Sequence, residues 1–525
     1  MTTRPRTRPT GVIPLVVLVA ALGIGGCASL PPLDGRIAST AITDTAGTRL
    51  GRAVEQAPEG RPEQSGQIPL SDPKKAFAAR VLLARAAERS LDVQYYIWHR
   101  DTTGLLMLQE LWNAAERGVR LRMLLDDNGI GGLDPILAVF DDHPNIEVRI
   151  FNPFPNRGFK PLGFLTQFKR LNRRMHNKSF TADSQATIVG GRNIGNEYFG
   201  AGQEMVFADL DVLAIGEIAA SVSEQFDLYW NSESAYPAKA IVAAPKPNAV
   251  AELEAQFASV RASSEAVEYV EEVRSTRLIE DLVERKIRFD WSPMQLVRDD
   301  PAKTLDRVEE SDLVLTHLKE AIGPAERELD IVSPYFVPRK GGAKTLSAYP
   351  ERGVRLRIVT NSLAATDSGV VHSKYARYRK ELLKTGIRLY ELKREATGPS
   401  ANREKRRTKG DGSGSSSASL HAKTISSDRS RAFVGSFNLD PRSAHLNTEM
   451  GLVIQSPELS ETISSVLDRT LPDRAYEVRL TPSGGLEWVE QGPQGEVRYG
   501  HDPKTGFFKR LFNRILGWLP IESLL

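Results

Sequence analysis

The chain of 525 residues has little that would mark a special class: one cysteine, eight histidines and 7% aromatic residues. A single cysteine excludes an intramolecular disulfide and a zinc site built from several cysteines. The 69 basic residues nearly balance the 66 acidic ones, so the net charge of +3 gives no overall field for nucleic-acid binding. Long apolar runs are confined to the N-terminus, and no interior segment is expected to span a bilayer. What remains is a globular chain long enough for two domains.

The N-terminus has the layout of an export signal. Three arginines within the first eight residues precede an apolar stretch, and two glycines lead to Cys27. The sequence IGGC, which ends at Cys27, resembles the lipobox of bacterial lipoproteins, in which the cysteine is lipidated. We therefore expect a signal peptide with a lipobox at 1–26, a lipid on Cys27 and a tether at 27–70. The alternative is a plain secretory peptide in which Cys27 is incidental.

A lipid on Cys27 would fix the location of the protein. It predicts export and anchoring to a bacterial membrane on the side that faces the periplasm. Ala28, rather than aspartate, follows the cysteine. In lipoproteins this resembles an outer-membrane sorting signal, so the outer membrane is one expected destination.

The chain contains an internal duplication. The hexapeptide RGVRLR occurs twice, and helix-like and apolar strand-like segments flank both copies in the same order. Strands that alternate with helices predict an α/β fold with two domains, each a mostly parallel sheet flanked by helices, and a site at their interface. We expect the domains at 71–236 and 317–480, with a mainly helical connector at 237–316.

Two further segments differ in composition from the domains. Residues 398–418 are rich in glycine, serine and charge, which predicts a loop whose basic cluster is either solvated or in contact with anionic headgroups. Residues 481–525 contain an amphipathic helix, in which aromatic and aliphatic residues recur at helical spacing between basic ones. Such a helix lies in a membrane interface or docks on the protein itself, and the sequence leaves both open.

One motif of polar residues occurs in both halves. In each copy lysine follows histidine by two positions, aspartate follows lysine by five, and glycine and asparagine come seven and ten positions after aspartate. The copies are His176, Lys178, Asp183, Gly190 and Asn193, and His421, Lys423, Asp428, Gly435 and Asn438. Strand alternation places histidine and lysine on the same face, where imidazole and ammonium can meet one phosphate. Asparagine can donate its amide to the phosphoryl oxygens, and the glycines, with Ser436, allow close approach.

Two histidines on one phosphorus suit phosphodiester chemistry. One imidazole attacks and forms a phosphohistidine, while the other protonates the leaving alcohol and then deprotonates the incoming one. The sequence does not decide between the two roles. Asp183 and Asp428 are expected to support the turn of the motif rather than to transfer protons.

Carboxylates are also expected to orient the imidazoles. Glu204 and Glu449 each lie 28 residues after the histidine of their own copy, and Asp209 or Asp211 competes with Glu204 for this role. A surface position for these acids is the alternative. The eight histidines are scattered, and we find no spacing typical of a metal site.

The duplicated pattern HxK(x)₄D(x)₆G(G/S)xN resembles the phospholipase D superfamily. Several segments are similar to the cardiolipin synthases, and those of the second half to the C-type bacterial branch. These segments are QYYIW (94–98), LLDDNG (124–129), VGGRNIGNEYF (189–199), DLDVLAIG (209–216), SPYFVP (333–338) and VGSFNLDPRSAHLNTEMGLVI (434–454). The resemblance extends from about Lys75 to the C-terminus. The lipobox-like start departs from the transmembrane helices that are common in bacterial synthases.

The resemblance implies a phosphatidyltransferase that needs no metal or other cofactor. A phospholipid, phosphatidylglycerol or phosphatidylethanolamine, would form the phosphatidyl-histidine, and a hydroxyl of a second phosphatidylglycerol would then take the phosphatidyl group, giving cardiolipin. It implies His176 as nucleophile and His421 as acid and base. The expected partners are phospholipids and a membrane surface, not nucleic acid. A hydrolase that releases phosphatidic acid, a nuclease and a non-catalytic lipid-binding lipoprotein remain as alternatives.

A third HxK sequence, His372-Ser373-Lys374, breaks the pattern. Arg379 stands where the motif requires aspartate. We expect this segment to be structural or to contact a headgroup.

Overall fold

The computed structural model describes residues 30–34, 36–54, 64–158, 160–201, 206–276, 286, 288–396, 417–492, 495–520 and 522. The expected signal peptide, Cys27 and nearly all of the loop 398–418 lie outside these residues. Within the described ranges, no helix combines the length and the apolar character needed to cross a bilayer.

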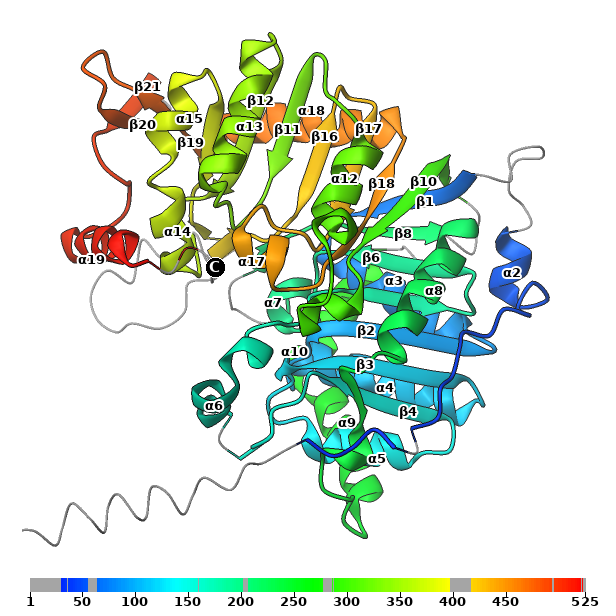
Figure 1. The fold of residues 1–525 in the computed structure, drawn as a ribbon. Coiled ribbons are helices and arrows are strands. Elements are labelled where there is room, and N and C mark those ends of the chain that lie inside the picture. The colour runs from blue at the N-terminus through cyan, green and yellow to red at the C-terminus, as the bar shows by residue number, and fades with distance from the viewer. Residues whose placement is uncertain are drawn as a thin grey trace, which may run out of the picture.

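The first half is a sheet with helices on both faces (Figure 1). Its strand order is β9-β4-β3-β2-β5-β6-β8-β1, in which β2, β3 and β4 are parallel and the others antiparallel. The strands are β1 (Gln64–Leu70), β2 (Ser90–Ile97), β3 (Arg120–Gly129), β4 (Ile146–Phe151), β5 (Ser179–Ala182), β6 (Ala186–Gly190), β8 (Asp211–Ile215) and β9 (Ala235–Pro237). The helices are α3 (Pro73–Ala86), α4 (Thr102–Glu116), α5 (Asp134–Asp142), α6 (Pro161–Leu171), α7 (Asn196–Phe199) and α8 (Glu217–Trp230). Helices α3, α4 and α5 pack in one apolar cluster, whereas α8 packs in others that use the alternate strand residues.

The second half repeats this order as β18-β17-β16-β11-β12-β13-β19, and β20 and β21 extend its edge. Its strands are β11 (Glu328–Val332), β12 (Arg355–Asn361), β13 (Arg388–Leu392), β16 (Thr424–Ser427), β17 (Arg431–Gly435), β18 (Met450–Ile454), β19 (Ala475–Leu480), β20 (Leu486–Gly492) and β21 (Gly495–Tyr499). Its helices are α12 (Val314–Ile322), α13 (Arg339–Glu351), α14 (Gly369–Tyr375), α15 (Arg379–Lys384), α17 (Pro441–His445), α18 (Pro457–Arg474) and α19 (Phe507–Trp518). The predicted duplication of an α/β domain is confirmed.

A buried ion pair explains why the repeated hexapeptide includes its last arginine. Arg122 on β3 donates from Nε and a terminal nitrogen to Asp92 on β2, at 2.7 and 2.8 Å. Arg357 on β12 makes the same two bonds to Asp330 on β11, at 2.8 and 2.7 Å. Each pair fastens the first two parallel strands of its half with a bidentate contact.

The connector is less helical than predicted. It contains α9 (Ala249–Ala262) and α10 (Ser264–Ser275), but also strand β10 (Asp290–Arg298), which pairs with β1 on one side and β18 on the other. Through β10 the two halves form one continuous sheet of 18 strands. A second, small sheet joins the halves where β15 (Ser417–Leu420) lies between β14 (Glu395–Ala396) and β7 (Val206–Ala208).

The prediction of a tether at 27–70 is wrong for the described part of this range. Residues 49–54 form α2 (Arg49–Val54), and β1 belongs to the main sheet. Arg36 donates to the backbone oxygens of Asn231 and Ala235, at 2.7 and 2.9 Å, so the segment before α2 is fixed on the first half. This polar part of the chain is held by hydrogen bonds of Arg36 and by the backbone pairing of β1, neither of which requires a periodic pattern of apolar residues.

Candidate active site

Each motif histidine is hydrogen-bonded through its backbone to the opposite half of the chain. The backbone N–H of His176 donates to the oxygen of Thr448 in the second half, at 2.9 Å. The backbone N–H of His421 donates to the oxygen of Ala208 in the first half, also at 2.9 Å. Each histidine therefore lies beside the chain segment of the opposite half that carries an acidic residue.

Those acidic residues orient the imidazoles across the interface. His176 Nδ1 is 2.8 Å from Glu449 Oε2, and His421 Nδ1 is 2.6 Å from Asp209 Oδ2. The four side chains are buried, and the charge of His421 itself contributes to lowering the pKa of His176. The structure thus brings the two motif copies close together at the interface of the halves.

Asp209, not Glu204, is the structural counterpart of Glu449. In the first half Gly190 pairs with Asp211, and in the second Gly435 pairs with Gly451, so both acids lie two residues before the paired position. Glu204 lies outside the described residues. The spacing predicts that each acid orients the histidine of its own copy, with Asp209 or Asp211 competing with Glu204. In the structure, each histidine instead contacts the acid of the other half.

Burial keeps the two motif lysines close to losing their charge. The Nζ atoms of Lys178 and Lys423 donate to the backbone oxygens of His176 and His421, and Lys423 Nζ is 3.1 Å from His421 Nδ1. Desolvation lowers the pKa of Lys178 well below its ordinary value. It lowers the pKa of Lys423 to about 8, opposed by the nearby carboxylates. An anionic ligand between the lysines would restore both charges.

The two acids differ in charge state. Burial raises the pKa of Glu449 to about 7, although Lys178 and two serine hydroxyls oppose this. Burial also acts to raise the pKa of Asp209, but His421 and Lys423 outweigh it and hold this pKa below its usual range. At neutral pH the Asp209 side is therefore ionised, while the Glu449 side is close to its midpoint.

Ser436 and the motif glycines have structural roles that differ from the predicted contact with a ligand. Ser436 Oγ donates to Glu449 Oε2 and accepts the backbone N–H of Met450, so it holds the acid. A Cβ at Gly190 would lie 2.2 Å from Asp211 Oδ1, and one at Gly435 would lie 2.4 Å from the backbone oxygen of Met450. These glycines permit close packing of neighbouring strands.

The asparagines are not equivalent. Asn193 Nδ2 donates to the hydroxyl of Tyr198 at 3.0 Å, and its Oδ1 accepts the N–H of Ile97 at 3.2 Å. Asn438 Oδ1 is buried and accepts no hydrogen bond from the described part of the chain. Asn438 Oδ1 can therefore accept a hydrogen bond from a donor group of a ligand, such as a hydroxyl, whereas Asn193 Oδ1 already accepts one.

Two tyrosines contact the motif histidines, a role that the sequence did not predict. The ring of Tyr96 meets the ring of His176 edge-on at 5.0 Å, and Tyr198 meets His421 at 5.3 Å. Both belong to segments already noted, QYYIW and NEYF, but nothing in their spacing indicates contact with a histidine. They restrict rotation of the imidazoles.

Asp183 and Asp428 hold turns at the far end of the motif strands. Asp428 accepts backbone N–H groups of residues 326–328 at 2.8–2.9 Å, and Asp183 accepts those of residues 88–90 at 2.8–3.3 Å. Both have positive φ, +52° and +53°. Four-residue strands separate them from the lysines, so both motif aspartates support turns, as the sequence predicts, and do not lie among the catalytic side chains.

The third HxK sequence is part of helix α14, not of a strand. Arg379 donates to His372, Glu391 and Asp502, and so occupies the centre of a histidine and carboxylate cluster that could otherwise suit a metal. Lys374 Nζ donates to the backbone oxygens of Leu516, Gly517 and Leu519. This segment is therefore structural and holds the C-terminal helix.

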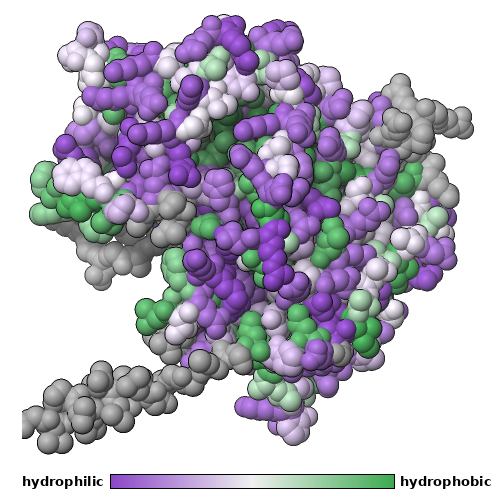
Figure 2. All heavy atoms as spheres, in the orientation of Figure 1, coloured by the Kyte–Doolittle hydropathy of each residue, from purple (hydrophilic) through white to green (hydrophobic). Residues whose placement is uncertain are grey.

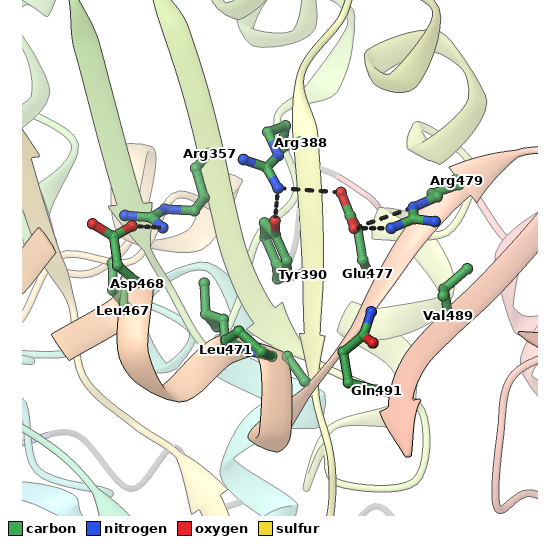
Figure 3. A pocket seen from close by; sticks show the side chains of 12 residues that line it. Arg357, Arg388, Tyr390, Leu467, Asp468, Leu471, Glu477, Arg479, Val489 and Gln491 are labelled. Carbon is green, nitrogen blue, oxygen red and sulfur yellow. Dashed lines mark hydrogen bonds and ion pairs between the residues drawn. The ribbon is translucent and has the colours of Figure 1, made fainter. Parts of the chain in front are cut away.

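A pocket of about 310 Å³ in the second half lies between β12, β13, β19 and α18 (Figure 3). Its cations are paired, Arg357 with Asp468 and Arg388 with Glu477. The equivalent groove of the first half is filled by the chain itself, since Arg122 donates to the oxygen of Ser39 and Asp227 accepts the N–H of Ala41. The motif histidines do not line this pocket.

Comparison with known proteins agrees with the duplicated fold. Residues 82–230 and 318–471 match the family model described as cardiolipin synthase, PLD-like domain. Over 477 residues the chain is 44% identical to cardiolipin synthase C of Escherichia coli K12, covering 91% of this chain and 100% of the relative. It is 25% identical over 397 residues to cardiolipin synthase A of Pseudomonas syringae, covering 75% of this chain and 66% of that one.

A solved structure shares the fold over nearly its full length. The phosphatidylserine synthase of Haemophilus influenzae superimposes with a TM-score of 0.56 at 13% identity, covering 91% of this chain and 99% of that one. The predicted superfamily is confirmed by these findings. The chain belongs to the phospholipase D-like family of the cardiolipin synthases and is a phospholipid phosphatidyltransferase.

Proposed function

We propose that the chain makes cardiolipin by moving a phosphatidyl group from one phospholipid to a hydroxyl of phosphatidylglycerol. The observation that carries the proposal is the crossed pair of histidine–carboxylate contacts. It holds two buried imidazoles at the interface of the halves, close enough for the charge of His421 to lower the pKa of His176. The name of the relative that is 44% identical supports cardiolipin as the product. Phosphatidylglycerol or phosphatidylethanolamine is the donor.

The reaction proceeds through a phosphohistidine. His176 Nε2 attacks phosphorus, the bond from phosphorus to the headgroup oxygen breaks, and the leaving alkoxide takes a proton from His421 Nε2. The hydroxyl of the acceptor phosphatidylglycerol then loses its proton to His421 and attacks phosphorus, and the phosphorus–nitrogen bond breaks. Lys178, Lys423 and Asn438 hold the phosphoryl oxygens.

The assignment of roles follows from the two acids. The general acid must carry a proton when the donor arrives, and ionised Asp209 opposes the lowering of the pKa of His421 by burial. The partner of His176 is close to its midpoint, so it stabilises an imidazolium less. His421 therefore suits proton transfer and His176 suits attack.

The lipobox-like segment supports a location on a membrane. Lipidation at Cys27 would place the chain on a bacterial membrane on the side facing the periplasm, including the outer membrane as a destination. Incorporation of labelled fatty acid that is lost in Cys27→Ser tests this location.

The product tests the function. In bacteria that lack cardiolipin, expression of the parent chain is expected to yield cardiolipin in the lipid extract, measured by mass spectrometry. His176→Ala and His421→Ala should yield none, whereas His501→Ala, at an exposed histidine, should equal the parent. Phosphatidic acid without cardiolipin would show a hydrolase instead, and no change in either lipid would favour a binding protein.

A further inference from the structure

The C-terminal helix α19 is docked with its polar side inward. Asn513 and Gly517 are its buried residues and face α14. Its aromatic residues point away from the protein: Phe508, Phe512 and Trp518 are 82%, 62% and 77% exposed. An amphipathic helix that packs on its own protein buries the opposite face. The apolar face of α19 is therefore exposed, and such a face is typical of a site that binds another surface.

Polar contacts from Lys374 and Tyr378, here called the mount of α19, hold this helix on the protein. Lys374 of α14 donates to three backbone oxygens at the C-terminal end of the helix, where cations are favoured. The hydroxyl of Tyr378 also donates to Glu522, just beyond the helix, at 2.6 Å. These contacts fix the direction of α19 without using its apolar side chains.

A second apolar projection comes from the first half. In helix α6, Leu165 is 82% exposed and Phe168 is 45% exposed. Helix α6 and α19 project from the same side of the molecule, and both appear as hydrophobic areas in Figure 2. The sequence around each helix, 157–174 and 503–520, contains basic residues and no aspartate or glutamate. Around α6, Lys169 is exposed, whereas acidic residues of other segments pair with Arg157, Lys160, Arg173 and Arg174. Apolar residues among basic ones match an anionic phospholipid surface.

Both helices lie at the edge of the sheet where the histidines lie. Helix α6 follows the carboxyl end of β4, and α14, which carries α19, follows the carboxyl end of β12. The His-x-Lys segments lie just before β5 and β16, whose first residues pair with residues near the carboxyl ends of β2 and β11. The projections therefore flank the catalytic edge.

We infer that α19 and α6 form one docking face that seats the catalytic edge on an anionic phospholipid surface, with the third HxK segment as the mount of α19. The inference rests on the proposed function only in taking a phospholipid as substrate. Lipid binding at this face does not require turnover, so the two can fail separately.

Trp518 reports the contact directly. With the full-length chain carrying His421→Ala, vesicles of phosphatidylcholine and phosphatidylglycerol that contain brominated acyl chains should quench part of the tryptophan fluorescence. This quenching should be lost in Trp518→Phe and reduced on phosphatidylcholine alone. Quenching that is unchanged by Trp518→Phe would overturn the inference, even if cardiolipin is formed. Quenching without cardiolipin formation in the parent would overturn the proposed function and leave the face standing.

Activity on two substrate forms separates docking from folding. The variant F508S/F512S/W518S should lose roughly tenfold or more of its activity on vesicles and keep its activity on a monomeric short-chain phospholipid. The matched control L228S/V250S/V466S removes three exposed apolar side chains, 41–46% exposed, from other helices and should keep both activities. An equal loss on both substrates would reveal a structural role for α19 and contradict the inference.

The mount has its own test. Lys374→Met should keep quenching of Trp518 but lose turnover on vesicles, because the helix then reaches the lipid without holding the catalytic edge there. Unchanged turnover would contradict the role of Lys374. A dimer in light scattering that F508S/F512S/W518S converts to a monomer would show instead that this face binds a second copy.

Discussion

Asparagine at position 209 should damage the site far more than glutamine at position 449, although both changes only replace a carboxylate by an amide. Asp209 Oδ1 accepts the backbone N–H of Leu210 at 2.8 Å, and its Oδ2 faces His421 Nδ1 at 2.6 Å. In Asp209→Asn the amide oxygen is needed to accept the N–H of Leu210, so the NH₂ group faces His421 Nδ1. The imidazole must then carry its proton on Nε2 and lose it from Nδ1.

Restoring the reactive tautomer of His421 would leave two buried donors facing each other. At about 2 kcal/mol for each unsatisfied donor, the penalty is about 4 kcal/mol, or a roughly thousandfold loss of rate. In Glu449→Gln the amide oxygen can keep His176 and Ser436, while the NH₂ group takes the place of the oxygen that Ser443 contacts at 2.7 Å. The hydroxyl of Ser443 rotates to accept, so only the charge is lost, at roughly tenfold.

The assay is the initial rate of cardiolipin formation from phosphatidylglycerol in mixed micelles, with thermal unfolding as the check that both variants fold. Single-turnover measurements with labelled donor separate formation of the phosphohistidine from its transfer. Equal losses in the two variants, or an Asp209→Asn enzyme within tenfold of the parent, would refute the tautomer argument.

Four other predictions concern pH and stability. The plot of kcat/KM against pH should rise through about 7 as Glu449 ionises and fall above about 8 as Lys423 loses its proton, and Glu449→Gln should abolish the rise. Since the fold favours neutral Glu449, its contribution to the free energy of unfolding is present below about pH 4.5 and is lost as pH rises through about 7; denaturant titration of the parent and Glu449→Gln measures it. Asp428→Ala should lower the free energy of unfolding by about 2–4 kcal/mol, because three backbone N–H groups lose their acceptor, and a loss under about 1 kcal/mol would contradict this. Arg357→Met should cost about 3–5 kcal/mol by leaving Asp330 buried and unpaired, and adding Asp330→Leu should recover most of it; no recovery would show that packing, not charge, is the cause.

The sequence predicted the parts of the fold that carry regular patterns. The repeated hexapeptide and the alternation of strands and helices sufficed for two α/β halves, because apolar strand-like segments recur in the same order between helix-like ones. Strands β1 and β10 were missed because QSGQIPL and DWSPMQLVR contain glycine or proline and polar residues. They form strands because each finds partners on both sides, which no local pattern records.

The candidate site was predictable in composition but not in pairing. Equal spacing identified His176 and His421, yet counting 28 residues forward led to Glu204 in the first half. The distance from histidine to acid is 33 residues there and 28 in the second half, so the duplication is inexact at this point. The register of the paired strands was needed to identify Asp209 as the counterpart of Glu449. The contacts between the two halves were needed to show that Asp209 orients His421 and not His176.

The crossed pairs also explain how a symmetric scaffold performs an asymmetric reaction. The first half has Gly191 and the short Asp209, and a Cβ at Gly191 would lie 2.2 Å from Asp209 Oδ1. The second half has Ser436 and the longer Glu449, to which that serine donates. The same place in the repeat thus supplies an ionised acid to one histidine and a hydroxyl-bound acid near its midpoint to the other.

The total charge of the site depends on the same difference between Asp209 and Glu449. With both lysines charged, as a bound anion favours, ionised Asp209 and a half-ionised Glu449 give the site a charge between zero and +1 at neutral pH, which suits the single negative charge of a phosphodiester. Were Glu449 as acidic as Asp209, the empty pocket would be neutral and would bind an anion less well. Were it an uncharged residue, two lysines would face one acid, and burial would drive a proton from Lys178 or Lys423. A glutamate held near its midpoint lies between these two outcomes, because it is ionised in part of the molecules and neutral in the rest at neutral pH.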